Sequence, residues 1–407
     1  MANTAVIILF SIVLLCITAT QGRKTLHQNN EWLTSYPVVD DIDGICKTMV
    51  ETQGYTCEEH KVTTEDGYIL SLQRMPVGRS GKKADKPPVL LQHGIFADAI
   101  TWLFNLPDES LGFILADNGY DVWLANTRGT KYSSGHTSLD PNDMAYWDWS
   151  WDELASYDLP AFVQYVYNQT GQKVHYVGYS LGALMALAAF SQGQVLNMLR
   201  SAALLGPTAH MNQITSLPIK IAAESFIADA VYWLGLREFI PNGQVEAKFV
   251  EDICNTLHMN CLKLITPFTG PNCCINSSRI DVFLDHEPQP TATKNLIHLS
   301  QMIRTGNIAK YDYDVQEQNM QNYGQPVPPP YDMTEIPNEF PLFLSNGGQD
   351  MLSDVKDLQV LLNDLKDHDG NKLVVLFKED YAHLDYAMGV NANQMIYDPM
   401  MAFFKDN

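Results

Sequence analysis

A serine flanked by two glycines stands where a short apolar run gives way to a helical pattern. The motif Gly-Tyr-Ser-Leu-Gly occupies residues 178–182; it follows the apolar run Val174–Val177 and precedes a stretch rich in alanine and leucine. A strand that turns directly into a helix leaves no room for large side chains where the two elements meet, so glycines on both sides of the serine are typical of such a turn. The motif predicts a strained turn that exposes the Ser180 hydroxyl at the positive end of the helix dipole. The alternative is an ordinary strand-to-helix turn with an incidental serine.

Short apolar runs that end in turn residues recur on both sides of this motif. They are continuous rather than alternating, as is typical of strands buried on both faces of a parallel sheet. Helical patterns separate them; the clearest begins with a capping box at Ser150–Glu153, and Pro160 is expected to kink or split that helix. The alternation predicts an α/β fold with a mainly parallel sheet. The runs are Val89–Leu91, Asp121–Ala125, Val174–Val177, Ser201–Leu205, Pro341–Leu344 and Leu373–Phe377.

Two segments depart from this alternation. Near the N-terminus, residues 58–64 and 68–74 flank Asp66-Gly67, a pair that tolerates the positive φ of a hairpin turn. Between Gly206 and about Pro337 the chain is rich in amphipathic stretches and clustered cysteines. We expect this long segment to be an insertion that folds over the sheet, where loops at the carboxyl ends of strands surround the active site.

The N-terminus has the features of an export signal. The apolar stretch Ala5–Cys16 leads into small or polar residues up to Gly22, and it is too short for a comfortable membrane span. We expect residues 1–22 to be removed, a mature chain that begins near Arg23, and no other membrane-spanning segment. No Lys or Arg precedes the apolar stretch, so a retained anchor is the alternative.

Cysteine usage agrees with export. Of the seven cysteines, Cys16 lies in the expected signal, and the even number that remains is typical of disulfides in an oxidising compartment. Cys46 and Cys57 are close in sequence and isolated from the others, so we expect them to be joined. Zinc is the competing interpretation, but the spacings lack a C-x-x-C pair. The pairing of the other four is left open; they are Cys254, Cys261, Cys273 and Cys274.

Charge and sequons bear on partners and processing. The formal net charge of -21 at pH 7 repels nucleic acids and anionic membranes, so neither is an expected partner. The same acidity keeps the chain soluble.

Asn168 and Asn276 each begin an N-x-S/T sequon and are candidate glycosylation sites.

A serine nucleophile requires a base and an acid elsewhere in the chain. The serine hydroxyl reacts poorly until a histidine takes its proton, and an acid must orient that histidine. His383 is the only histidine after the last predicted strand, and Asp350 follows a glycine turn at the end of the strand before it. We predict Ser180 as nucleophile, His383 as base and Asp350 as acid, in the chain order Ser, Asp, His. Asp354 is the rival acid; it lies further from the glycine turn.

The oxyanion that forms on the substrate needs preorganised hydrogen-bond donors. One should be the backbone amide of Leu181, the residue after the nucleophile. The second should come from the loop after the strand 89–92, where we choose the amide of Ile95. His93 precedes it; no partner ligand lies at a suitable spacing for a metal, so we expect a structural role. Neither a metal nor a cofactor is expected.

These residues belong to a series of motifs that resembles the acid lipase family, which includes gastric and lysosomal acid lipases, and most closely its plant-type triacylglycerol lipases. The similarity covers nearly all of the mature chain and implies an α/β-hydrolase fold, the triad and oxyanion roles given above, and a cap and lid formed by residues 207–334. The sheet core would then be 86–206 and 335–407, preceded by an N-terminal segment with a β-hairpin, 23–85. The motifs are Asp66–Leu70, Leu91–Gly94, Gly112–Asp117, Asn126–Gly129, Tyr157–Ala161, Asn276–Arg279, Gly347–Asp350 and His383–Asp385.

One position departs from the family pattern. The usual histidine before the nucleophile is Tyr179 here. Because this residue is not a triad member, we expect activity to survive, with an altered substrate fit or pH response.

The resemblance implies a secreted lipase that hydrolyses carboxylic esters of hydrophobic substrates, triacylglycerol first, at a lipid–water interface. Its final compartment would be extracellular or vacuolar/lysosomal. An esterase or acyltransferase acting on a sterol ester or a specialised hydrophobic ester is the alternative, because water or another alcohol can resolve the same acyl-serine. A non-catalytic binding protein on this scaffold is the second alternative, and the presence of all three triad residues argues against it.

Overall fold

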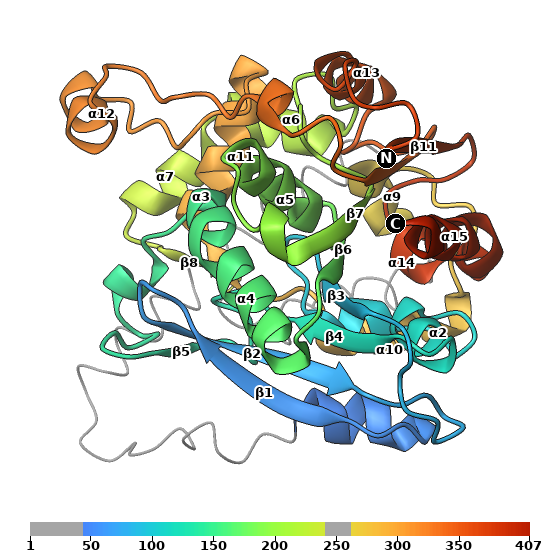
Figure 1. Ribbon diagram of the computed structural model, residues 1–407. Helices are drawn as coiled ribbons and strands as arrows, with labels where there is room; N and C mark the ends of the chain where they lie inside the picture. Colours follow the sequence, from blue (N-terminus) through green and yellow to red (C-terminus); the bar gives the residue numbers. More distant parts are fainter. Residues whose placement is uncertain (1–43, 241–261) are drawn as a thin grey trace, which may run out of the picture.

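One large sheet forms the centre of the computed structural model, which describes residues 44–240 and 262–407 (Figure 1). Its strands and those of a small second sheet are β1 (Glu58–Thr63), β2 (Tyr68–Met75), β3 (Pro88–Gln92), β4 (Asp121–Ala125), β5 (Gly135–His136), β6 (Val174–Tyr179), β7 (Leu199–Leu205), β8 (Glu238–Phe239), β9 (Thr291–Ala292), β10 (Leu342–Gly347) and β11 (Leu373–Lys378). The order in the large sheet is β1-β2-β4-β3-β6-β7-β10-β11, with β5 beside β2. Neighbours from β4 to β11 are parallel, whereas β1, β2 and β5 pair antiparallel. The α/β class with a mainly parallel sheet is confirmed.

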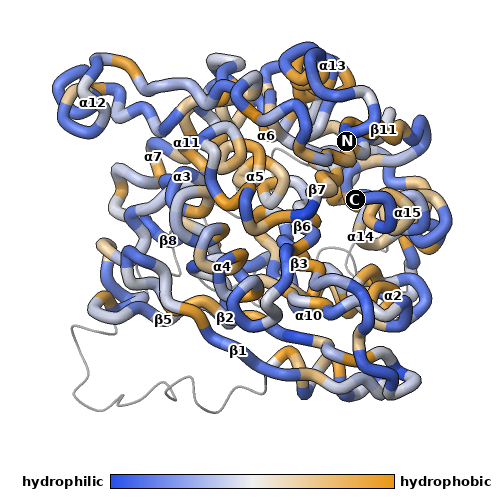
Figure 2. The backbone as a smooth tube through the Cα atoms, viewed as in Figure 1, coloured by the Kyte–Doolittle hydropathy of each residue, from blue (hydrophilic) through white to orange (hydrophobic). Residues whose placement is uncertain are grey.

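Helices cover both faces of this sheet. They are α2 (Leu111–Asp117), α3 (Trp151–Glu153), α4 (Leu159–Thr170), α5 (Leu181–Ser191), α6 (Leu217–Glu224), α7 (Ile227–Trp233), α9 (Leu262–Thr269), α10 (Ile280–His286), α11 (Thr293–Thr305), α12 (Gln316–Tyr323), α13 (Val355–Asp364), α14 (Asp385–Met388) and α15 (Asp398–Asp406). Side chains of the strands alternate between the two layers: Leu90 and Tyr176 pack with α4 and α5, while Val89 and Val177 pack with α2 and α15. Every residue of α5 is buried, and Figure 2 shows hydrophobic residues gathered along it.

The last strand differs from the sequence prediction. All six apolar runs lie in strands of the large sheet, but the run Leu373–Phe377 is not buried on both faces. It forms β11 at the edge of the sheet, and Val374, Val375 and Phe377 are exposed there. A continuous apolar run looks the same in sequence whether its strand is central or at an edge, so burial was overestimated here.

The helix after Ser150 begins and divides as predicted. Ser150 Oγ accepts from the amide of Asp152, and Glu153 reaches back to the Ser150 amide, completing the capping box. A π-helical turn at residues 154–158 then separates α3 from α4, and Pro160 lies in the first turn of α4. Proline is tolerated at that position because its missing N–H has no partner there in any helix.

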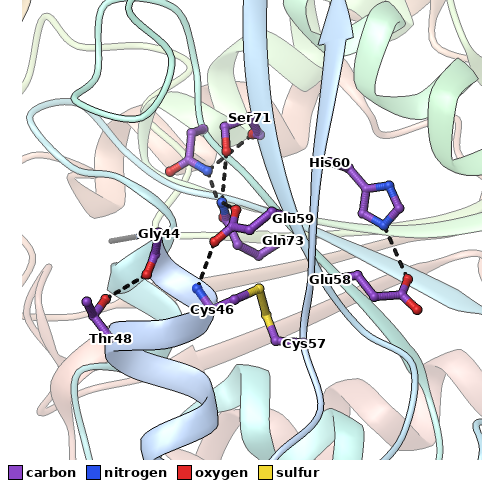
Figure 3. Close-up of a disulfide and its surroundings, with 10 residues drawn as sticks. Gly44, Cys46, Thr48, Cys57, Glu58, Glu59, His60, Ser71 and Gln73 are labelled. Atoms are coloured by element: carbon purple, nitrogen blue, oxygen red, sulfur yellow. Dashed lines mark hydrogen bonds and ion pairs between the residues drawn. A yellow bond between two sulfur atoms is a disulfide. The ribbon is translucent and has the colours of Figure 1, made fainter. Parts of the chain in front are cut away.

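A disulfide joins Cys46 to Cys57 at the start of β1, as expected (Figure 3). The Glu59 carboxylate accepts from the Cys46 amide at 2.9 Å and from Gln73 Nε2 of β2 at 2.7 Å. The N-terminal turn is thus tied both covalently and through hydrogen bonds to the hairpin formed by β1 and β2.

A buried arginine joins this hairpin to the rest of the sheet. Arg128 follows β4, is almost completely buried, and makes two-pronged contacts with Asp158 and Asp66. Its guanidinium also lies 3.8 Å from the centre of the Tyr68 ring. Three motifs that are far apart in the sequence therefore meet at one cation.

The chain between β7 and β10 is mainly helical. It contains α6, α7, α9, α10, α11, α12 and the two-stranded sheet β8–β9, and α11 packs against α6 and α7. Cys254 and Cys261 of this stretch, like the expected signal 1–22, lie outside the described residues.

Within the described ranges, none of the helices combines the length and the apolar character that a membrane span requires.

We predict that Arg128→Leu destabilises the protein by about 3–5 kcal/mol, because it leaves the Asp158 carboxylate buried without its cation. Urea unfolding followed by circular dichroism measures the loss. Arg79→Leu is the matched control: the Arg79–Asp117 pair is exposed, so its loss should cost below about 1 kcal/mol. Equal losses in the two variants would contradict the structural role assigned to Arg128.

Candidate active site

The backbone of Ser180 adopts a conformation that side chains rarely allow. Its φ is 55° and its ψ is -115°, and it forms the N-cap of α5 directly after β6. Such a residue is strained by about 1–3 kcal/mol unless its surroundings hold it, and strain of this kind clusters at functional sites. The Ser180 amide donates to the carbonyl of Leu205 in β7 at 3.0 Å, which fixes the turn to the sheet.

Close backbone contacts explain the glycines around this turn. A Cβ on Gly178 would lie 2.6 Å from the carbonyl oxygen of Gly182, and one on Gly182 would lie 2.6 Å from the carbonyl oxygen of Gln92. The end of β3 is thus pressed against the first turn of α5. A Cβ on Gly94 would come within 3.0 Å of the Ser180 Cβ, so the loop after β3 runs directly beside the serine.

Three side chains from separate loops meet at the turn. His383 Nε2 lies 2.8 Å from Ser180 Oγ, and His383 Nδ1 lies 2.8 Å from Asp350 Oδ2. The Asp350 Oδ1 atom accepts from the amides of Leu352 and Ser353, so the carboxylate is held in place. Because a carboxylate only accepts, Nδ1 carries the proton and Nε2 is free to accept the serine proton.

The geometry separates the two candidate acids. Asp350 contacts His383, whereas Asp354 is the N-cap of α13 and accepts from the amide of Lys356 at 2.8 Å. An aspartate immediately before a helix is a common cap, and this second role explains its presence so close to Asp350.

Tyr179 contacts the histidine loop. Its hydroxyl donates to the His383 carbonyl at 2.8 Å, and the two rings are 5.1 Å apart. Burial raises the pKa of Tyr179 well above its usual value, so the hydroxyl keeps its proton and remains a donor. Tyr179, the residue that departs from the family pattern, therefore forms a hydrogen bond to the backbone of His383. The sequence did not reveal this contact.

The predicted oxyanion donors lie close to each other. Ile95 and Leu181 both line one small cavity, together with Gly94 and Phe96. The amide of Leu181 is the first of α5 and has no carbonyl within the helix to receive it. Phe96 has a positive φ of 59°, and its carbonyl accepts from the Gln289 amide at 2.8 Å, so the stretch between β7 and β10 fixes this loop.

His93 is engaged at both ring nitrogens. Nδ1 donates to the Gly94 carbonyl at 2.8 Å, and Nε2 accepts from the Thr127 amide at 3.1 Å. Burial lowers the pKa of His93 to about 4, so the ring is neutral at physiological pH. The side chain therefore connects the end of β3 to the loop after β4, which is a structural role.

Two buried carboxyl groups flank the loop that carries Ile95. Glu287 Oε1 accepts from the Asp98 amide at 3.1 Å, and Asp98 Oδ1 caps the turn at residues 99–103 through the Ile100 amide. The remaining oxygens, Asp98 Oδ2 and Glu287 Oε2, are buried and have no hydrogen-bond partner among residues 44–240 and 262–407. Burial raises the pKa of Asp98 to about 7 and that of Glu287 well above its usual value. The two residues are 189 positions apart, and no sequence motif signals the contact.

A second disulfide joins Cys273 to its neighbour Cys274. Their sulfurs and the Asp385 carboxylate form the one group of three potential metal ligands found in the described ranges. Because the sulfurs are bonded to each other, they offer no thiolates to a metal ion here.

The two sequons differ in accessibility. Asn168 is exposed near the end of α4, whereas Asn276 is half-buried and its Nδ2 donates to Glu109 at 3.0 Å. A glycan on Asn276 would have to be accommodated beside Glu109, since the sugar is attached to the same Nδ2 atom. Modification of either residue remains a prediction.

Comparisons with known proteins agree with this architecture. A family model described as alpha/beta hydrolase fold matches residues 87–386, and one described as partial alpha/beta-hydrolase lipase region matches residues 46–106. The chain is 48% identical to triacylglycerol lipase 2 of Arabidopsis thaliana over 366 residues, which are 89% of this chain and 88% of that protein. It is 35% identical to human gastric triacylglycerol lipase over 370 residues, 88% of this chain and 90% of that protein. A solved structure of a soluble variant of monoglyceride lipase from Saccharomyces cerevisiae has a TM-score of 0.54 at 15% identity, covering 86% of this chain and 96% of that one, which shows the shared fold.

We predict that Asp98→Asn changes how stability depends on pH. A carboxyl with a raised folded-state pKa contributes stability below its unfolded pKa and loses that contribution as pH rises through the folded pKa, here from about 4 to about 7. Asparagine keeps the cap and does not titrate, so the variant should match wild type near pH 4 and gain a few kcal/mol relative to it by pH 8, on the order expected for such a shift. Urea unfolding at both pH values measures the difference; parallel pH profiles for the two proteins would contradict the assignment.

Proposed function

Because this chain belongs to the acid lipase branch of the alpha/beta hydrolase family, we propose that it hydrolyses carboxylic esters of hydrophobic substrates through an acyl intermediate on Ser180. The single observation that carries the proposal is the hydrogen-bonded series from Ser180 through His383 to Asp350 at a strained turn. The matches to triacylglycerol lipases make a long-chain acylglycerol the substrate class of choice.

In the first half-reaction, Ser180 Oγ attacks the ester carbonyl while His383 Nε2 takes its proton. Asp350 holds the imidazole in the tautomer that can accept, and stabilises the imidazolium that forms. The amides of Leu181 and Ile95 stabilise the oxyanion. His383 then gives its proton to the leaving alcohol, and the acyl group remains on Ser180.

In the second half-reaction, a water molecule gives its proton to His383 and attacks the acyl carbonyl. The fatty acid leaves, and the proton returns to Ser180 Oγ. An added alcohol could replace this water and yield a new ester, so measuring ester formation in the presence of a competing alcohol distinguishes hydrolysis from acyl transfer.

Exposed apolar side chains support an action at a lipid–water interface. Trp233 and Leu234 at the end of α7 are 82% and 65% exposed, and Phe226 just before α7 is 51% exposed. They lie in the proposed cap, residues 207–334. A group of large apolar side chains on one short stretch marks an interaction site rather than scattered surface residues.

The same proposal places the protein in the secretory pathway, with an extracellular or vacuolar/lysosomal destination. Support comes from the signal-like N-terminus and from two disulfides in the described ranges, since disulfides persist in oxidising compartments.

The triad is tested by substitution. Ser180→Ala should lower kcat for a soluble ester by at least about 10⁴-fold, and adding His383→Ala should lower it scarcely further, because the triad acts as a unit. Asp350→Asn should cost roughly 10³–10⁴-fold, since the histidine loses its tautomer. Asp354→Asn is the matched control and should remain close to wild type, because asparagine also caps helices. Full hydrolysis by Ser180→Ala would overturn the proposed function, and an inactive Asp354→Asn beside an active Asp350→Asn would reassign the acid.

The interface is tested with two forms of substrate. Trp233→Ser/Leu234→Ser should lower the rate on emulsified triacylglycerol by about tenfold, given the apolar area lost from the contact, and leave the rate on a dissolved short-chain ester unchanged. Met144→Ser is the control, because it removes an exposed apolar side chain (58% exposed) that lies outside the proposed cap. Equal losses on both substrates would show that the α7 residues act on the active site rather than on the interface.

A further inference from the structure

One short segment contacts both loops that carry the histidine and the acid. It begins at Thr269, the last residue of α9, and runs to Cys274; we call it the bracket. The Thr269 carbonyl accepts from the amide of His383 at 3.1 Å and from the amide of Met351, the residue after Asp350, at 3.5 Å. The Thr269 carbonyl thus links the backbone of His383 to the backbone of the loop that carries Asp350.

Further contacts press the bracket against these loops. Asn272 Oδ1 accepts from the amide of Leu384 at 2.9 Å. Gly270 has a φ of +100°, and a Cβ there would lie 2.0 Å from the Gln349 carbonyl oxygen, so any larger residue would push the acid loop away. The bracket therefore lies against residues next to both proposed triad members, through backbone and side-chain contacts.

A buried carboxylate completes the connection. Asp385 is fully buried and accepts three backbone amides: Ala382 at 2.8 Å, Cys273 at 3.1 Å and Cys274 at 2.9 Å. Ala382 directly precedes His383, so Asp385 links the histidine loop to the end of the bracket. The Asp385 carboxylate depends on amides that the two cysteines supply.

The disulfide between Cys273 and Cys274 controls the direction of those amides. A bond between adjacent cysteines closes a small ring that includes the peptide bond joining them, which restricts the backbone torsions of both residues. The N–H groups of Cys273 and Cys274 both point at the Asp385 carboxylate. Without the disulfide, the two residues regain the ordinary freedom of a loop, and holding both amides on Asp385 costs conformational entropy.

We propose that the bracket is the positioning element for His383 and Asp350, and that the Cys273–Cys274 disulfide keeps it in the shape that catalysis requires. Neither cysteine touches the reacting atoms; both act through Asp385 and the histidine backbone. The inference rests on the proposed triad.

The disulfide is also accessible. It lines a surface cavity of about 430 Å³, beside Lys378 and Tyr381, and Cys273 is exposed. A dithiol can therefore reduce it: the S–S bond breaks, each sulfur gains an electron and a proton, and the dithiol is oxidised to its own disulfide. Turnover by the enzyme would then depend on the redox state of this pair.

The test compares two disulfides in the full-length protein. Cys273→Ser/Cys274→Ser should lower kcat for a dissolved short-chain ester by about tenfold or more, the scale expected when a base is slightly misplaced, with KM little changed. KM should stay near wild type because the bracket's contacts described above are with the loops of Asp350 and His383, not with Ile95 or Leu181. Cys46→Ser/Cys57→Ser is the matched control: it should unfold at a lower temperature and keep the wild-type kcat.

A second variant covers the case in which the double serine variant fails to fold. Asn272→Ala leaves the disulfide intact and removes the hydrogen bond to the Leu384 amide, together with the bonds from Asn272 Nδ2 to Thr269 Oγ1 and to the Gly270 carbonyl within the bracket. We expect kcat to fall several-fold while KM stays near wild type. Dithiothreitol should lower kcat of wild type and of Cys46→Ser/Cys57→Ser, and should not lower kcat of Cys273→Ser/Cys274→Ser further.

Three outcomes would overturn the inference. The first is a folded Cys273→Ser/Cys274→Ser protein with wild-type kcat, and the second is an Asn272→Ala protein with wild-type kcat. The third is peptide mapping of the unreduced protein that finds Cys273 and Cys274 joined to other cysteines. If any of these three outcomes is observed and Ser180→Ala is inactive, the proposed function stands and only the role of the bracket is wrong. If Ser180→Ala is active, the proposed function itself fails.

Discussion

The strained turn at Ser180 is the constraint on which the rest of the site depends. A non-glycine residue at positive φ is stable only because the surrounding structure fixes it: β7 accepts its amide, α5 is buried along its whole length, and the end of β3 is pressed against the first turn of α5. The same contacts that hold the strain also bring Gly94 and Ile95 beside the serine. Exposure of the nucleophile and proximity of the oxyanion loop are therefore two results of one packing arrangement.

The part of this site that the sequence could predict is the part that is local or ordered along the chain. The central parallel strands are short apolar runs, Ser180 directly follows one of them, and Asp350 and His383 each follow another within a few residues. The glycines report close backbone approach, so these three residues could be proposed from the sequence. The exposure of β11 could not be predicted, because an apolar run carries no information about which strands neighbour it. Contacts between remote segments were equally invisible. Asp98 meets Glu287, Tyr179 meets the His383 carbonyl, and neither pair has a periodicity or motif that links its members.

Several remote contacts come from the stretch between β7 and β10. On the side of Ile95, the Glu287 side chain accepts from the Asp98 amide, and the Gln289 amide donates to the Phe96 carbonyl. On the other side, the Thr269 carbonyl accepts from the amides of His383 and Met351, and the amides of the paired cysteines donate to Asp385. This stretch therefore contributes contacts to the frame of the candidate site on both sides.

The sequence distance between the bracket and His383 has a consequence for folding. The bracket belongs to the stretch between β7 and β10, whereas His383 lies in the loop after β11, so the backbone contacts of His383 form only when these two remote segments have docked. A partly folded chain could therefore pair the central strands and still leave the imidazole without its frame. The hydrogen-bonded series from Ser180 to Asp350 is thus a property of the completed fold rather than of the sheet alone.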